Sequence, residues 1–220
     1  MSERLQQQIA FLVEIDRLKR VLRRTRLLDG SRYENSAEHS WYFAMAALVL
    51  SEYAREPIDL FRVVKMALVH DIVEVDAGDT FVFDEQARQS QHEREARAAE
   101  RLFGLLPPEQ AQEFRALWEE FIARQTPEAQ FAAALDSLVS VLANAHTGGG
   151  SWRENGIPLE RVLGFDQRIE QGAPLLWEFA KQLIEQTFEQ MTEQMANSEW
   201  RMEGEAAAEP LEGEAPAKPF

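Results

Sequence analysis

The chain contains no cysteine among its 220 residues. Disulfide bonds and thiolate chemistry are therefore excluded, and this composition is compatible with the reducing cytoplasm, where we expect the protein. A long apolar run is also missing, because the longest such stretch, residues 41–50, is too short to span a bilayer. The N-terminus shows no basic region followed by an apolar run. We therefore expect neither a signal peptide nor a membrane as a partner.

Positive charge is scarce, since 23 Lys and Arg residues face 38 Asp and Glu residues and leave a net charge of −15. An acidic protein repels a polyphosphate, so nucleic acid is not an expected partner. The basic residues are unevenly placed, and seven of them lie between Arg17 and Arg32. This run is either a solvated helix face or a local anion site. Its closeness in sequence to His39 favours the second interpretation.

The hydrophobic pattern predicts helices and no strands. With 45% hydrophobic residues, the chain is long enough for one core, so we expect a single domain over residues 1–200 with a C-terminal helical extension. Apolar residues at three- and four-residue steps predict an all-α helical bundle. The expected helices cover residues 3–23, 36–53, 60–73, 85–103, 108–124, 127–143 and 159–196, and residues 24–34 and the glycine-containing segment 144–158 are expected loops. The acidic tail, residues 203–220, has few apolar residues and is expected to be disordered.

Four polar residues interrupt apolar helices. His70 and Asp71 end the apolar segment 60–73, His39 opens the apolar segment 36–53, and Asp136 lies within FAAALDSLV. Each alone is more often a hydrogen-bonded core or surface residue than a metal ligand. Buried together, two imidazoles and two carboxylates suit a divalent transition metal, which would offset the cost of burying all four.

The motifs that contain these residues resemble a known family. The order H…HD…D, with the segments RYENSAEHS, ALVHDIVEVDAGD and AAALDSL, resembles the 5′-deoxynucleotidase branch of the HD-domain metal-dependent phosphohydrolases over about residues 10–145. The resemblance implies a helical bundle that hydrolyses a phosphomonoester, typically a deoxynucleoside 5′-monophosphate. It implies four metal ligands, His39, His70, Asp71 and Asp136, and an acidic pair acting on water and leaving group, Glu74 and Asp79.

The resemblance also implies a substrate-binding arginine, Arg24, fifteen residues before His39. Arg20 or Arg32 could join Arg24 in neutralising the phosphate charge. This branch often has tryptophan after that arginine, whereas Thr25 stands here, so the sugar and base preference stay open. The metal is expected to be manganese, cobalt, iron, zinc or magnesium, because a bound divalent cation makes water more acidic and polarises a phosphoryl oxygen.

Two alternative functions remain open. One is an HD hydrolase of another phosphate ester, such as a nucleoside triphosphate or a guanosine polyphosphate. The other is a non-catalytic helical module with a structural metal, against which the intact Glu74 and Asp79 argue. A separate question is assembly: apolar residues on the last helix either pack on the domain's own core or form a homodimer. This stripe comprises Leu175, Leu176, Trp177, Phe179, Ile184 and Phe188.

Overall fold

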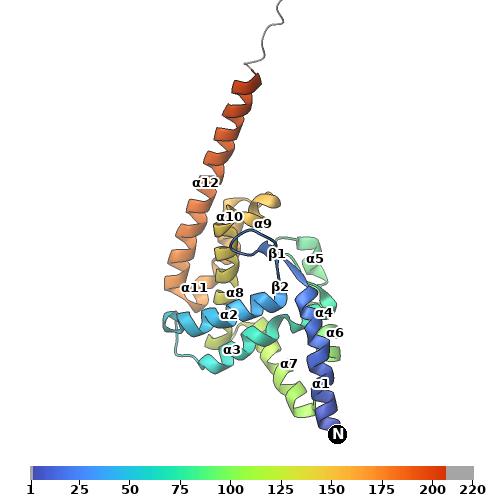
Figure 1. The fold of residues 1–220 in the computed structure, drawn as a ribbon. Helices are drawn as coiled ribbons and strands as arrows, with labels where there is room; N and C mark the ends of the chain where they lie inside the picture. Colours follow the sequence, from blue (N-terminus) through green and yellow to red (C-terminus); the bar gives the residue numbers. More distant parts are fainter. Residues whose placement is uncertain (1, 207–220) are drawn as a thin grey trace, which may run out of the picture.

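The computed structural model describes residues 2–206, with side chains described to residue 196. Most of the chain is helical, which confirms the all-α fold class (Figure 1). The α-helices are α1 (Glu3–Ile15), α2 (Ser36–Leu50), α3 (Leu60–Val69), α4 (Glu74–Ala77), α5 (Glu85–Gln89), α6 (Gln91–Phe103), α7 (Pro108–Ala123), α8 (Pro127–His146), α9 (Gly150–Glu154), α10 (Leu159–Asp166), α11 (Arg168–Gly172) and α12 (Pro174–Ala206). Three 3₁₀ turns join them, η1 (Asp16–Arg20), η2 (Ser51–Tyr53) and η3 (His70–Val73).

A small hairpin was missed by the hydrophobic pattern. Strand β1 (Leu22–Arg26) pairs antiparallel with β2 (Tyr33–Asn35), where a helix end and a loop were predicted. The strands are short, and three of the five residues of β1 are arginines. Such a strand shows no alternation of apolar and polar residues from which it could be recognised. The hairpin nevertheless brings part of the basic run next to α2.

The C-terminal half is more divided than predicted. The expected loop 144–158 contains the end of α8 and the short helix α9, and the expected helix 159–196 consists of α10, α11 and the start of α12. The last break falls at Gly172-Ala173, directly before Pro174, which is well suited to the first turn of a helix. Helix α12 includes the backbone of residues 203–206. The rest of the tail predicted to be disordered, residues 207–220, lies outside the described residues.

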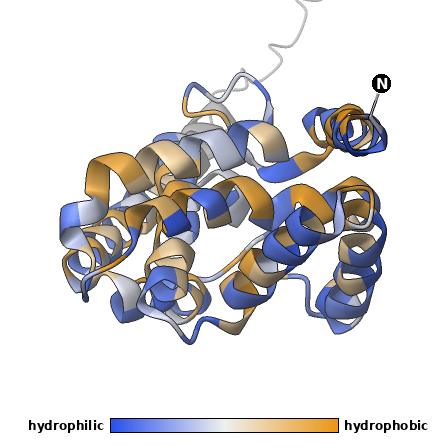
Figure 2. Cartoon of the chain, turned by 90° about the horizontal axis from the view of Figure 1, so that it is seen from below, coloured by the Kyte–Doolittle hydropathy of each residue, from blue (hydrophilic) through white to orange (hydrophobic). Residues whose placement is uncertain are grey.

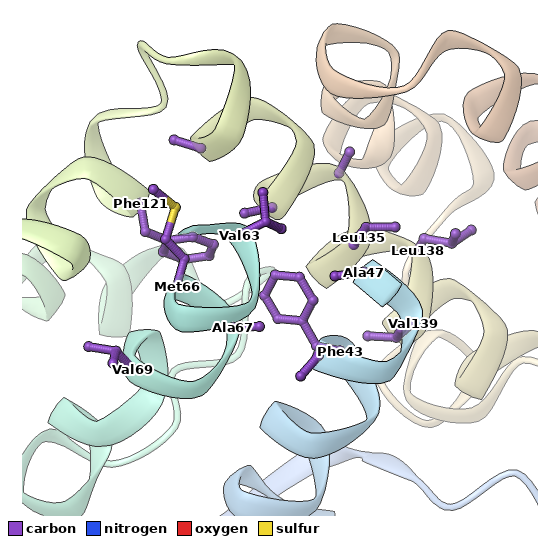
Figure 3. Packing of buried hydrophobic residues seen from close by; sticks show 14 of the residues in the cluster. Phe43, Ala47, Val63, Met66, Ala67, Val69, Phe121, Leu135, Leu138 and Val139 are labelled. Carbon is purple, nitrogen blue, oxygen red and sulfur yellow. The ribbon is translucent and has the colours of Figure 1, made fainter. Parts of the chain in front are cut away.

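The core is formed where α2, α3 and α8 meet. Phe43 of α2, Met66 of α3 and Leu135 of α8 are almost completely buried (Figure 3). Hydrophobic and hydrophilic residues alternate along the helices that surround this core (Figure 2). Although residues 41–50 form the longest apolar run of the sequence, α2 is not buried on all sides, because Trp41 is 62% and Val49 65% exposed. Its buried face, however, continues directly into the polar residues described next.

The apolar stripe on α12 divides between the core and the surface. Leu176, Trp177 and Ile184 are buried, whereas Leu175 and Phe179 are exposed. Further along, α12 extends well beyond the rest of the molecule (Figure 1). Within residues 2–206, no helix combines the length and the apolarity needed to cross a membrane.

Candidate metal centre and active site

The four predicted ligands come from three elements, α2, η3 and α8, that meet at one end of the core. His39 lies in the first turn of α2, whose start is fixed by a capping box between Asn35 and Glu38. His70 and Asp71 form the start of η3, where the α-helical hydrogen bonding of α3 tightens into a 3₁₀ turn. Asp136 lies in the middle of α8. The contacts between α2, α3 and α8 therefore place all four residues at one end of the core.

Three of the four side chains converge. The ligand atoms of His39, His70 and Asp136 all lie within 4.8 Å of one another. His39 Nε2 lies 3.0 Å from Asp136 Oδ1. His70 Nδ1 lies 3.0 Å from the carbonyl oxygen of Ala67, an acceptor that favours the tautomer with the proton on Nδ1. That leaves His70 Nε2 free to accept, and this buried nitrogen has no hydrogen-bond partner among the described residues.

Asp71 lies beside this cluster rather than within it. Its Oδ1 is 2.9 Å from His70 Nε2, and its Oδ2 accepts a hydrogen bond of 2.9 Å from Arg23. The carboxylate is therefore adjacent to the cluster and is oriented by an arginine.

The residues present fit a divalent metal. Two imidazoles and a carboxylate converge in a buried setting, and a second carboxylate, Asp71, lies 2.9 Å from His70 Nε2, a buried nitrogen to which no described group donates a hydrogen bond. His39, His70 and Asp136 would hold the ion, with Asp71 as the fourth ligand.

Glu34 supports this centre and was missed by the sequence analysis. Its Oε2 lies 3.5 Å from His39 Nδ1 and accepts a hydrogen bond of 3.3 Å from Thr25. A carboxylate behind a metal-binding imidazole orients the ring and makes the other nitrogen more basic. The only signal in the sequence was an acidic residue five positions before His39, which an exposed loop residue would also give. Thr25 is buried and supports Glu34.

The carboxyl groups of the site fall into two classes, those with lowered and those with raised pKa values. Burial opposes ionisation of Asp136 and Asp71, but neighbouring groups outweigh it and lower both pKa values; His39 dominates at Asp136 and His70 at Asp71. The pKa of Glu74 is raised well above its usual range, first by burial and then by the charge of Asp71. Burial also raises the pKa of Asp79, against the effect of Arg23. Pairs of carboxyl groups whose pKa values diverge indicate an acid–base assignment.

The imidazole of His39 lies in the same anionic surroundings. Burial and the charge of Arg23 lower its pKa, but hydrogen bonds to Asp136 and Glu34 outweigh them and raise it to about 9. A metal that binds His39 therefore has to displace a proton, so we expect metal affinity to rise with pH.

Glu74 and Asp79 both face the cluster, as predicted. Ser36, at the start of α2, donates a hydrogen bond of 2.6 Å to Glu74 Oε2 and fixes that carboxyl group. Asp79 Oδ1 lies 3.7 Å from Arg23. Between the two, Gly78 has φ 73°, a conformation that favours glycine and turns the chain back towards the site.

The arginines are arranged differently from the prediction. Residues of β1 alternate between two faces, so Arg23 and Thr25 point inward while Arg24 is exposed. Arg23 contacts Asp71 and lies 3.8 Å from Glu34. Burial opposes its charge, but the surrounding carboxylates, led by Asp71, outweigh that effect and raise its pKa.

The three predicted arginines lie outside the cluster. Arg24 lines a pocket that opens beside it. Arg20 is exposed at the end of η1, and Arg32 pairs with Glu38 through both guanidinium nitrogens. The structure therefore brings only Arg24 towards the site, and it adds Arg23, which the sequence analysis did not select.

The pocket beside the cluster encloses about 540 Å³, part of it open to solvent. Its lining includes three charged residues of the cluster and its surroundings, Arg23, Asp79 and Asp136. The lining is otherwise rich in aromatic and small polar side chains, namely Thr25, Phe81, Phe83, Ser140, Asn144, Ser151, Trp152 and Phe165. This arrangement can hold an anion next to the metal ligands and a flat, partly apolar group further away.

Two further residues of this pocket, Asp166 and Arg168, lie beyond residues 10–145, the part of the sequence in which motifs were recognised. Arg168 Nη2 is 3.8 Å from Asp136 Oδ2, and its Nε donates to the hydroxyl of Ser137. Burial raises the pKa of Asp166 to about 7, although the charge of Arg168 opposes this. No sequence motif marked either residue.

The raised pKa of Asp166 predicts an effect on stability. An acid with a folded pKa of about 7 and an unfolded pKa near 3.8 holds its proton in the folded state over this interval, so the free energy of unfolding falls as pH rises from about 4 to 7. Asp166→Asn removes this penalty, and the variant should gain stability over wild type across that interval, by about 4 kcal/mol at most. Urea unfolding of metal-free protein at pH 5 and pH 8 measures it. An equal difference at both pH values would contradict it.

Comparison with known proteins shows which family the chain belongs to. The HD domain family matches residues 15–177. The chain belongs to the HD domain family. The structure of this HD domain brings together three of the four ligands that the resemblance implied, His39, His70 and Asp136. The fourth, Asp71, lies next to them.

Individual relatives of this HD domain protein carry informative names. It is 33% identical over 135 residues to the 5′-deoxynucleotidase HDDC2 of Bos taurus and 31% identical over 135 residues to that of Homo sapiens. These matches cover 61% of this chain, and 64% of the bovine and 65% of the human protein, so they span a little under two thirds of these relatives.

A solved structure covers more of the chain. The HD domain protein superposes on a predicted metal-dependent phosphohydrolase from Magnetospirillum magnetotacticum with a TM-score of 0.82 and 50% identity, over 85% of this chain and 94% of that chain. A conserved hypothetical protein from Pyrococcus furiosus, with a TM-score of 0.55 and 22% identity over 82% of this chain and 99% of that chain, shares the fold.

Proposed function

We propose that this protein is a metal-dependent phosphohydrolase that releases phosphate from deoxynucleoside 5′-monophosphates. One observation carries the proposal. The buried Glu74 and the partly buried Asp79 line the same cavity as His70, Asp71 and Asp136, beside a cluster of metal-ligand type, and both carboxyl groups have raised pKa values. A structural metal site needs no such pair. The names of the bovine and human relatives and of the Magnetospirillum protein support the same chemistry.

Glu74, Asp79 and Arg23 each have a separate role in hydrolysis. When bound, a divalent metal supplies positive charge that polarises a phosphoryl oxygen and makes water more acidic. Glu74, held by Ser36, can take a proton from the attacking water or give one to the leaving sugar oxygen. Asp79 can serve the other of these two transfers, and its contact with Arg23 keeps it beside the cluster. Arg23 also orients Asp71.

Charge near the pocket favours one phosphate group over three. Arg24, Arg23 and Arg168 are the arginines that line the pocket among the described residues, and Arg23 and Arg168 are engaged by carboxylates. Arg24 lies there without a side-chain ion pair to any described residue and is therefore the candidate phosphate ligand, as the sequence predicted. A triphosphate or a guanosine polyphosphate would need more cations that are free to bind it.

The activity is tested on a panel of substrates. Phosphate release from dAMP, AMP, dCMP, dATP, a guanosine polyphosphate and an aryl phosphate is measured after adding manganese, cobalt, iron, zinc or magnesium to metal-free protein. We expect release from the monophosphates, faster for the deoxy form, and with one of these metals. No metal-dependent release from any monophosphate would refute the proposal, and release from polyphosphates alone would favour the alternative hydrolase.

Substitution of Arg24 should change mainly KM, whereas substitution of Arg23 should change kcat and metal affinity. Arg24→Ala should raise KM by about 10- to 100-fold with a smaller change in kcat, because one charged hydrogen bond to the phosphate is lost. Arg23→Ala should lower kcat and metal affinity, because Asp71 and Asp79 lose their common partner. Steady-state kinetics with metal titration separate the two effects. The matched control is Arg20→Ala, which removes an exposed charge of the same run. A lower kcat with unchanged KM in Arg24→Ala would contradict the assignment.

We propose that the protein is cytoplasmic and acts as a homodimer. Exposed apolar side chains on α2 and at the start of α12, including Trp41, Val49, Leu175 and Phe179, favour assembly. Light scattering at micromolar concentration should give about twice the chain's mass of 25.2 kDa, and Phe179→Glu should shift it to the monomer. A monomeric wild-type mass would rule this out.

A further inference from the structure

Asp166 is a buried carboxyl group without a partner. It is 4% exposed, and within the residues whose side chains are described no group donates a hydrogen bond to it or forms an ion pair with it. Its nearest influential charges are Arg168, two residues further on, and Asp136. Burying a carboxyl group in this way costs free energy, so the fold alone does not explain it. A ligand that donates a hydrogen bond would remove the cost.

The position of Asp166 in the pocket indicates which part of a ligand it meets. The pocket follows α8 from Asp136 past Ser140 to Asn144, about 12 Å for eight residues of helix. A phosphate group must lie at the end formed by Asp136 and Asp79, next to the metal ligands. A second, adjoining pocket shares Asp79 and Asp136 with this one and is also lined by His70, Asp71 and Glu74. Asp166 lines only the first pocket, in the part of the lining that His70, Asp71 and Glu74 do not reach, which leaves it for the part of a substrate beyond the phosphate.

The surroundings of Asp166 suit a nucleoside. Phe165 lies next to it in the chain, and the rings of Phe165 and Phe83 are 5.4 Å apart in a tilted contact. Trp152 closes the same pocket and is 2% exposed. Flat apolar walls with one hydrogen-bonding group are typical of sites that bind small aromatic ligands in a fixed orientation. A phosphate monoester is mostly dianionic at neutral pH and then offers only acceptors, whereas a nucleoside offers sugar hydroxyl and base N–H groups.

We propose that the carboxyl group of Asp166 accepts a hydrogen bond from the nucleoside part of the substrate and determines specificity for it. This inference rests on the proposed function and deepens it. The donor is the 3′-hydroxyl or an amino group of the base, which share this chemistry. Asp166 acts in recognition and takes no part in proton transfer at the phosphate.

The test removes each donor from the substrate in turn. Wild-type protein is assayed with dAMP, with 2′,3′-dideoxyadenosine 5′-monophosphate, which lacks the 3′-hydroxyl, and with 2′-deoxypurine riboside 5′-monophosphate, which lacks the amino group. We expect kcat/KM to fall by about 10-fold or more for the analogue that lacks the relevant donor, because the buried acceptor is then unpaired. In Asp166→Ala the same analogue and dAMP should react equally well. Asp166→Asn retains Oδ1 as an acceptor and should discriminate to an intermediate degree.

A matched control and a binding measurement complete the test. Glu160→Ala removes an exposed carboxylate from the same helix, α10, and should discriminate like wild type. Dissociation constants measured by calorimetry in a Glu74→Gln background give the same comparison without turnover, so the inference is tested even if phosphate release fails. Discrimination that persists unchanged in Asp166→Ala, or equal affinity of wild type for all three nucleotides, would overturn the proposal.

Discussion

His70→Ala should lose both the metal and the activity. His70 Nε2 is buried, has no hydrogen-bond partner and lies within the cluster formed with His39 and Asp136. Removing one of few ligands from a site of this kind leaves too little binding free energy to retain the ion. We expect elemental analysis to find wild-type protein loaded after metal addition and the variant essentially free of metal. Phosphate release should fall to the background rate.

The same variant has a thermodynamic consequence. A ligand that binds the folded state stabilises it, by about 2.7 kcal/mol at one hundred times its dissociation constant. Adding metal should therefore raise the Tm of wild type and leave that of His70→Ala unchanged. His92→Ala, which removes an exposed histidine on α6, is the control and should behave like wild type. Equal metal content in wild type and His70→Ala would show that the ligand set is wrong.

Glu74→Gln should keep the metal and lose the turnover. The substitution preserves the shape of the side chain but removes the group whose pKa is raised by burial and by Asp71. Loss of one acid–base group lowers kcat by about 10²- to 10⁴-fold. Metal content should stay at the wild-type level, because Glu74 is not among the converging ligands. Stopped or steady-state phosphate assays, combined with elemental analysis of the same sample, measure both quantities.

A second buried carboxyl group, which lines the same cavity as Glu74, provides the comparison for Glu74. Glu95 of α6 is also buried with a raised pKa, but it accepts its hydrogen bond from Gln91 of the same helix. Glu95→Gln should therefore change kcat much less than Glu74→Gln. If the two variants lose the same activity, burial of charge rather than acid–base chemistry explains the effect. Ser36→Ala should lower kcat to a smaller degree than Glu74→Gln, since it frees the carboxyl group without removing it.

Residues that interrupt a regular pattern could be predicted from the sequence. His39, His70 and Asp136 stand out because each is a polar residue in an apolar helix, and the structure brings these three together. Glu74 and Asp79 followed from the resemblance to the family, and both line the cavity that adjoins His70. The difference between Arg23 and Arg24 could not be predicted in the same way, because it depends on the phase of a strand. Without knowledge of strand β1, the sequence does not distinguish Arg23 from Arg24. It therefore could not predict that Arg23 points inward and Arg24 outward.

Other parts of the site depend on contacts across the fold. Glu34 acquires its role because the hairpin places it behind His39, and Asp166 because it ends α10 directly before α11, which packs on α8. Neither contact produces a periodic pattern of apolar residues from which it could be predicted. The exposed face of α2 was also unpredictable, since a helix that is apolar on every side does not reveal which side lacks a neighbour.

The close approach of Gly172 to α8 defines how much chain the catalytic unit needs. A Cβ atom at Gly172 would lie 2.2 Å from the carbonyl oxygen of Gln130, so the two backbones touch without an intervening side chain. Helix α11 is thereby fixed to the helix that carries Asp136, and with it Arg168 and Asp166. A fragment cut after residue 145 would contain every residue of the HD motif, yet it would leave one flank of α8 bare and the substrate pocket without a wall. The minimal catalytic unit therefore ends beyond Gly172, well after the last metal ligand.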